Sequence, residues 1–175
     1  MQTPDVAQDE TLLRQIHPGG NPIFFDPMQN PPIHHSVFRP TDRDTDGLSL
    51  IRQRFRTDIW AAYRLEQPAI RFRLARLSVA KLSELAEQLG LGSLSFPHSP
   101  DGLDNLHGQP WAHCVLSEIN RNAYDSTFSA KVAIKEWMLA VAKSIAIEAV
   151  IGPFEEPNDT HPYRPDKPEC ESPNQ

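Results

Sequence analysis

The stretch from residue 69 to residue 90 constrains the fold more than any other part of the sequence. In AIRFRLARL, residues 69–77, apolar side chains alternate with arginines, which is the pattern of a β-strand with one face in water. The next residues, SVAKLSELAEQLG, place leucines at helical spacing, with Ser78 as the expected N-cap and Gly90 as the expected C-cap. The chain therefore contains both strands and amphipathic helices.

The remaining segments divide in the same way into short strands, helices and turn-rich loops. The expected strands are residues 11–17, 35–40, 48–55, 111–119 and 145–153, of which 111–119 is apolar enough to be central and the last is closed by Gly152-Pro153. The expected helices are residues 57–67 and 126–144, the second capped by Ser126 or Thr127, and residues 93–110 form a long loop. Because strands and helices do not strictly alternate, this order predicts an α+β domain with a mixed or antiparallel sheet of about five strands and about three helices.

Residues 34–55, HHSVFRPTDRDTDGLSLIRQRF, predict a β-hairpin. Asp46-Gly47 is the turn signal, with Gly47 supplying a positive φ. The two strands are expected to bring Arg39, Arg52 and Arg54 to the surface. The alternating aspartates lack the glutamate that a calcium loop needs six residues after its glycine, so they are interpreted as turn residues that bond nearby amides.

Composition separates the ends of the chain from its body. The length of 175 residues suggests one domain, over residues 11–154. Residues 1–10 and 155–175 are predicted to be disordered tails, because the second has five prolines, six acidic residues and two basic ones. The net charge is −6, yet residues 39–81 hold nine arginines and one lysine against five acidic residues, a balance of +5. A basic body between acidic tails favours a charged partner, and nucleic acid is one possibility.

The cysteines and the hydropathy of the chain bear on its location. Cys114 lies in an apolar run and Cys170 in the acidic tail, a usage that fits a reducing cytoplasm better than a disulfide framework. The N-terminal residues are acidic and lack the apolar segment of a signal peptide. No stretch approaches the ~20 apolar residues of a spanning helix. The sequence thus predicts a cytoplasmic location without membrane association.

Several short motifs occur in a suggestive order: LLRQIHP near the start, FRP before an acidic turn and LSL, and PWAHCVL before a long helix. In this order the chain resembles a group of small uncharacterised bacterial proteins with an R-Q-hydrophobic-H-P motif and a later histidine between apolar residues. The resemblance spans roughly residues 12–150. It implies a bacterial source and a single domain, and it implies no activity.

The histidines are the residues most able to carry chemistry. His34 and His35 are neighbours, so on a strand they cannot both ligate one ion, and no histidine or cysteine has metal-ligand spacing. A tertiary site from His35, His113 and an aspartate stays open, but no metal or cofactor is predicted; phosphate-loop and dinucleotide fingerprints do not occur. His113 must find a hydrogen-bond partner within its apolar run, as a core residue or as a general base. Cys114 beside it would face the opposite way and is interpreted as core.

If a catalytic site exists, the sequence places it where His35 and Arg39 meet His113 and His17. The leading functional hypothesis is nevertheless a non-enzymatic accessory protein, which binds a protein partner in a toxin, defence or secretion module. Its expected partner-binding residues are the arginines of the body: Arg39, Arg52, Arg54, Arg71 and Arg73. The alternatives are a small enzyme acting on a nucleotide or nucleic acid, with His113 as acid or base and Arg39 as phosphate clamp, and nucleic-acid binding through residues 39–81.

Overall fold

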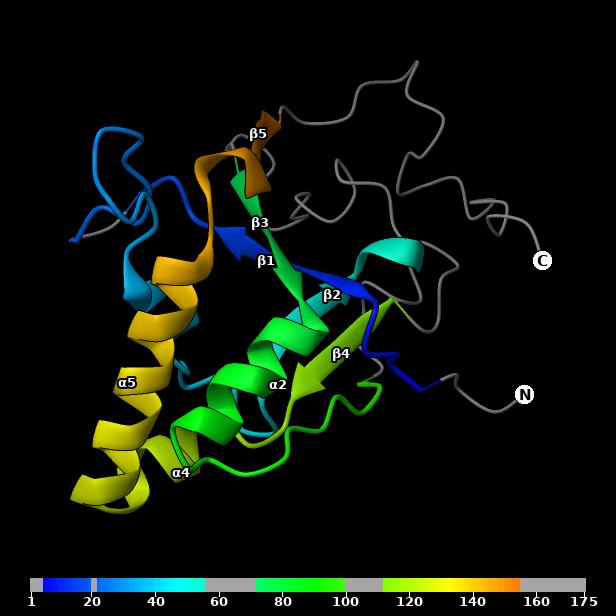
Figure 1. Cartoon of the computed structure of the whole chain (residues 1–175), viewed down its shortest axis with the longest axis vertical. Coiled ribbons are helices and arrows are strands. Elements are labelled where there is room, and N and C mark those ends of the chain that lie inside the picture. Colours follow the sequence, from blue (N-terminus) through cyan, green and yellow to red (C-terminus); the bar gives the residue numbers. More distant parts are fainter. Residues whose placement is uncertain (1–4, 20–21, 56–71, 100–111, 155–175) are drawn as a thin grey trace.

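Five strands of the chain join into one antiparallel sheet (Figure 1). The computed structural model describes residues 5–19, 22–55, 72–99 and 112–154. The strands are β1 (Thr11–Ile16), β2 (Leu48–Arg52), β3 (Phe72–Ser78), β4 (His113–Leu116) and β5 (Val150–Phe154), in the order β4-β2-β1-β3-β5. The first strand in sequence is thus the middle strand of the sheet. The predicted α+β domain, with a sheet of about five strands, is confirmed.

Three α-helices and three 3-10 helices complete the described part of the chain. They are α2 (Val79–Gln88), α4 (Arg121–Ser126) and α5 (Phe128–Ser144), with η1 (His35–Phe38), η2 (Gln53–Phe55) and η3 (Ile147–Ala149). The predicted caps are confirmed: the Ser78 side chain accepts from the Lys81 amide at 3.3 Å, and Thr127 caps α5 by accepting from the Ala130 amide at 3.0 Å. Gly90 follows α2 with φ +75°. Helices α2 and α5 thus begin where a hydroxyl satisfies an amide that would otherwise lack a partner, and at α4 the Oδ1 atom of Asn120 does the same for the Ala123 amide at 2.7 Å.

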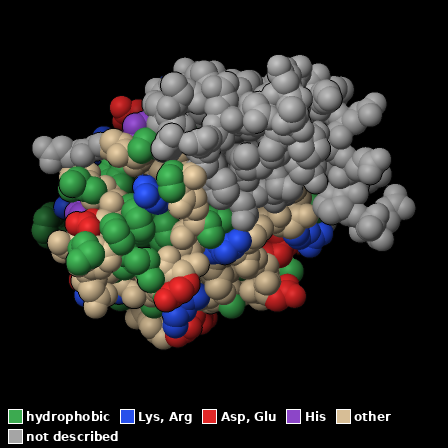
Figure 2. Space-filling model, turned by 90° about the horizontal axis from the view of Figure 1, so that it is seen from above, with side chains coloured by type: hydrophobic (Ala, Val, Ile, Leu, Met, Phe, Trp, Pro, Cys, Tyr) green, Lys and Arg blue, Asp and Glu red, His purple; other side chains and the backbone are tan. Residues whose placement is uncertain are grey.

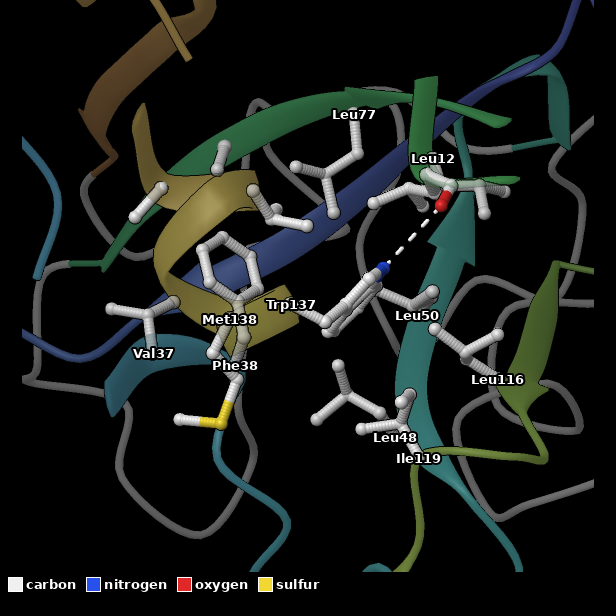
Figure 3. Close-up of a cluster of buried hydrophobic side chains, with 14 of the residues drawn as sticks. Leu12, Val37, Phe38, Leu48, Leu50, Leu77, Leu116, Ile119, Trp137 and Met138 are labelled. Atoms are coloured by element: carbon white, nitrogen blue, oxygen red, sulfur yellow. Dashed lines mark hydrogen bonds between the residues drawn. The ribbon is translucent and has the colours of Figure 1, made fainter. Parts of the chain in front are cut away.

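One face of the sheet is covered by α2 and α5, which lie side by side in Figure 1. Alternate residues of the strands point toward these helices, as Leu48 and Leu50 do, and they form the main core (Figure 3). Trp137 of α5 is fully buried among them, and its indole N–H donates to the carbonyl of Leu82 in α2 at 3.3 Å. The opposite face carries a smaller cluster, built on Leu13, Phe72 and Leu74. Helices α2 and α5 thus lie on the face of the sheet that carries the main core.

The predicted hairpin over residues 34–55 is wrong, although its second strand is β2. Residues His35–Phe38 form η1 instead of a strand. Val37 and Phe38 are both buried in the same main core, which a helical turn allows and a strand does not, because neighbouring strand residues face opposite sides. The His34 ring nitrogen Nδ1 accepts from the Ser36 amide at 3.2 Å and starts the turn. Strand β2 therefore pairs with β1 and β4.

The last two predicted strands also differ from the structure in detail. The strand expected in the centre of the sheet, β4, lies at one end of the strand order. Its free side is covered by residues 95–99, part of the expected loop, through backbone bonds such as Val115 N–H to the Pro97 carbonyl at 3.1 Å. Gly152-Pro153, expected to end the last strand, lies inside β5. The predicted helix 57–67, residues 69–71 of the predicted strand, loop residues 100–110 and the tail residues 1–4 and 155–175 lie outside the described residues. Residues 5–10 of the predicted N-terminal tail are described, and Glu10 is buried there, so this end of the tail belongs to the domain.

Gly47 lies between the aspartate turn and β2 with φ +148°, which confirms the predicted positive φ. A Cβ here would lie 2.5 Å from the carbonyl oxygen of Leu116 and 2.9 Å from the Cα of Ser117. Gly47→Ala therefore combines backbone strain with a clash, and we expect it to lower the free energy of unfolding by about 2 kcal/mol. Gly90→Ala is the control, because nothing lies within 4 Å of its Cβ and only strain of about 1 kcal/mol remains. Denaturant unfolding measures both; equal losses would contradict the clash.

Candidate functional site

Ser49 of β2 and His113 of β4 form a hydrogen-bonded pair on the sheet face opposite to α2 and α5. The two strands pair with Ser49 opposite Val115 and with Ile51 opposite His113. These positions alternate with the core residues of both strands and so point away from α2 and α5. The Ser49 hydroxyl oxygen lies 2.7 Å from Nε2 of His113, and both side chains are half-buried.

The other ring nitrogen of His113 fixes the direction of this bond. Nδ1 lies 2.6 Å from the carbonyl oxygen of Ser99. A carbonyl oxygen only accepts, so the neutral imidazole carries its proton on Nδ1 and donates there. Nε2 is then the acceptor, and the Ser49 hydroxyl donates its proton toward His113. The partner that His113 was predicted to need is thus present on both nitrogens.

The backbone of Ser49 is held from both sides. Its amide donates to Oδ1 of Asp44 at 3.3 Å, and its carbonyl accepts from the Arg14 guanidinium at 2.8 Å. Asp44 is buried and also accepts from the amide and hydroxyl of Thr41, at 2.7 and 2.8 Å. Arg14 spans to the carbonyl of Val37 at 3.0 Å. Asp44 is therefore a turn residue that bonds nearby amides, as predicted, and with Arg14 it fixes the position of Ser49.

The structure does not bring together the four residues that were predicted to form a catalytic site, which are His35, Arg39, His113 and His17. His35 lies in η1, which packs against α5 on the helix side of the sheet, whereas His113 points from the opposite face. Arg39 lies with its guanidinium carbon 5.5 Å from the ring centre of Tyr124, also on the helix side. His17 packs edge-on against Phe72 at 5.5 Å between ring centres. A clamp of Arg39 on a substrate held by His113 is excluded by this placement.

The surroundings of His35 are cationic. Its ring stacks on that of His34 with 4.2 Å between centres. Burial lowers the pKa of His35 below its ordinary value, and the nearby charges of His34 and Lys135 lower it further. His35 is thus held in its neutral form next to α5.

The five predicted partner-binding arginines have different positions. Arg39 is exposed, while Arg73 is half-buried with its guanidinium carbon 4.7 Å from the ring centre of Phe25. Arg52 is only 1% exposed, which contradicts its predicted place at the surface. It follows Leu48 and Leu50 on the same strand face and is paired there with Glu10. Arg54 is 47% exposed and bonds the same carboxylate at 3.2 Å; Arg71 lies outside the described residues.

Hydrophobic side chains gather on parts of the described surface, with single charged side chains among them (Figure 2). The large hydrophobic residues that are exposed are Ile23, Met28, Phe128, Val132, Leu139 and Ile147. Three of these, Phe128, Val132 and Leu139, belong to α5. The sequence of α5 is rich in apolar residues and does not by itself show which of them are exposed.

Comparison of the chain with protein-family models, with curated proteins and with solved structures gives no match in any of the three. Within the described residues, no three histidine, cysteine, aspartate or glutamate side chains are grouped to hold a metal ion. Among the described residues, no helix is long and apolar enough to cross a membrane. Two features of the described structure are candidate functional sites: the Ser49–His113 pair and the outer face of α5.

Proposed function

We propose that this protein binds a protein partner through the outer face of α5, as an accessory or regulatory component without enzymatic activity of its own at that surface. The observation that carries the proposal is the exposure of Phe128, at 84%, together with that of Val132 and Leu139, at 36% and 42%. With Lys135, these residues are spaced by four, three and four positions. They therefore lie along one line of the helix, the spacing used by helices that dock into apolar grooves.

The charges around this line favour an acidic partner. Lys135 and Lys143 are exposed on the same side of α5, and exposed Glu136 is the acidic residue beside them. Arg39 and Lys131 both lie over the ring of Tyr124, at 5.5 and 5.1 Å from its centre, and so add positive charge near the start of α5. Such complementarity accelerates association and selects the partner. Arg39 thus keeps its predicted partner-binding role, whereas Arg52 is removed from it by burial.

Nucleic-acid binding through residues 39–81 receives less support. Among the described arginines of that segment, Arg52 is buried, Arg54 is paired with Glu10, and Arg73 lies over Phe25. Phosphate recognition needs cations that reach the backbone of the nucleic acid together. These arginines do not form one open surface.

A pull-down with the full chain as bait, followed by titration of the captured partner, tests the proposal. We expect Phe128→Ser combined with Leu139→Ser to weaken binding at least about 30-fold, because apolar anchors dominate interface energies. Ile147→Ser, an exposed apolar position of η3 at 43%, is the matched control and should bind as the wild type does. Binding should also weaken at high salt. A partner retained fully by the α5 variant, or lost when residues 155–175 are removed, would contradict the proposal.

A further inference from the structure

The Ser49–His113 pair has the arrangement of a base-activated nucleophile. The hydroxyl is 2.7 Å from Nε2, which accepts its proton, and a third group, the Ser99 carbonyl, holds the opposite nitrogen at 2.6 Å. A nucleophile, a base in hydrogen-bond reach and a group that orients the base are the elements of serine-dependent covalent catalysis. We propose that Ser49 is a nucleophile toward carboxylic esters, with His113 as its general base.

The backbone around both residues is fixed before any substrate binds. Asp44 and Arg14 hold the amide and the carbonyl of Ser49, and the His113 carbonyl accepts from the Ser99 amide at 3.2 Å and faces Nδ1 of His98 at 3.0 Å. This differs from an ordinary cross-strand serine contact, because four backbone bonds, three of them long-range, determine where the two side chains meet. Positioning of this kind reduces the entropy loss that a reaction would otherwise incur in bringing the two groups together.

The neighbours of the pair indicate the class of substrate. Ile51 lies opposite His113, and Val115 lies opposite Ser49, on the same sheet face. Ile51 also joins the apolar cluster of Leu13, Phe72 and Leu74. Ser49, His113 and Ile51 are half-buried, whereas Leu13, Phe72 and Leu74 are buried. The apolar surface beside the hydroxyl and the imidazole is therefore that of Ile51. A short apolar acyl group fits this surface better than a charged one, because a charge would lose its hydration there.

The reaction proceeds in two balanced steps. Ser49 Oγ attacks the ester carbonyl carbon while Nε2 of His113 takes the hydroxyl proton; the bond to the alcohol then breaks, and His113 returns the proton to the departing alkoxide. The products are the alcohol and an acyl ester on Ser49. In the second step His113 takes a proton from water, whose oxygen attacks the acyl carbon. The bond to Ser49 breaks, the proton returns to Ser49, and the free acid leaves.

Labelling of the full chain with an alkyl fluorophosphonate and hydrolysis of p-nitrophenyl butyrate test the assignment. We expect an adduct on Ser49, formed with loss of fluoride, that disappears in Ser49→Ala. His113→Gln should slow labelling about 100-fold, the usual contribution of a general base. Ser126→Ala is the matched control, because this exposed hydroxyl donates to the Ala123 carbonyl at 2.7 Å and lies outside the site, and it should label at the wild-type rate.

A structural role for the pair would give a different result. Labelling of the wild type should fall on acidification, because a protonated imidazole donates from both nitrogens and cannot accept the hydroxyl proton. This measurement needs no variant, so it applies even if His113→Gln fails to fold. The proposal is overturned if the folded wild-type chain forms no adduct on Ser49. It is also overturned if His113→Gln is labelled at the wild-type rate. Neither outcome bears on partner binding at α5, which lies on the other side of the sheet.

Discussion

Replacement of Trp137 by alanine is expected to lower the free energy of unfolding by about 3–5 kcal/mol, the range for deleting a large buried aromatic side chain. Trp137 has no exposed surface and lies between α2 and the helix side of the sheet (Figure 3). Its loss leaves a cavity where α5 meets Leu82 of α2 and leaves the Leu82 carbonyl without the indole N–H. Denaturant unfolding followed by far-ultraviolet circular dichroism measures the loss without relying on tryptophan fluorescence.

A matched control lies on the same helix. Leu139 is two positions further along α5 and is 42% exposed, so Leu139→Ala removes a side chain that contributes little to the core. We expect it to change the free energy of unfolding by about 0.5 kcal/mol or less. Equal losses from Trp137→Ala and Leu139→Ala would show that α5 does not pack on the sheet by the face described.

The second large effect is expected at the buried pair of Arg52 and Glu10. Arg52 is 1% exposed and Glu10 is 8% exposed, and the Arg52 Nε donates to Glu10 Oε2 at 2.8 Å. Glu10→Gln removes the negative charge that pairs with buried Arg52 in the described structure. We expect a loss of about 3 kcal/mol in the free energy of unfolding at neutral pH. Arg54→Ala, which removes the half-exposed member of the cluster, should cost about 1 kcal/mol or less.

The same pair makes stability depend on pH. Burial alone would raise the pKa of Glu10, but hydrogen bonds from Arg52 and the Ala7 amide, with the charges of Arg52 and Arg54, bring it below its ordinary value of 4.5. A lowered carboxylate pKa stabilises the fold at pH values above 4.5, and this stabilisation is lost as the pH falls through the folded-state pKa. The difference between wild type and Glu10→Gln should therefore be full at pH 7 and should shrink below pH 4.5. A constant difference over that range would contradict the linkage.

Features set by short sequence spacing could be predicted, and features set by strand pairing could not. Leu48, Leu50 and Arg52 share one strand face by their period of two, yet this spacing does not reveal that the face is the core side, and Arg52 was therefore predicted at the surface. The burial of Arg52 depends on Glu10, which comes 42 positions earlier and neutralises the guanidinium. The helix caps at Ser78 and Thr127 were predictable because a cap acts on amides two or three residues away.

The candidate site shows the same division. His113 was recognisable as a polar residue in an apolar run, but its partner Ser49 lies 64 positions earlier and becomes its neighbour only through the register of β2 and β4. Nothing local distinguishes Ser49 from other serines of the chain. The 3-10 turn at His35 was missed for a related reason, because a few alternating residues also fit a strand. Register is a property of the whole sheet, and no single segment contains it.

The position of Pro153 within β5 has a consequence for how copies of this protein meet. A strand at the end of a sheet offers its unpaired backbone groups to any other strand, and this is how ordered aggregates begin. In β5, Pro153 has no amide proton to offer, and proline is tolerated there because the strand pairs with β3 alone among the described strands. At the other end, residues 95–99 already bond to the outer side of β4. Both ends of the described sheet are thus poor templates for added strands, which protects the chain from amyloid-like growth at high concentration.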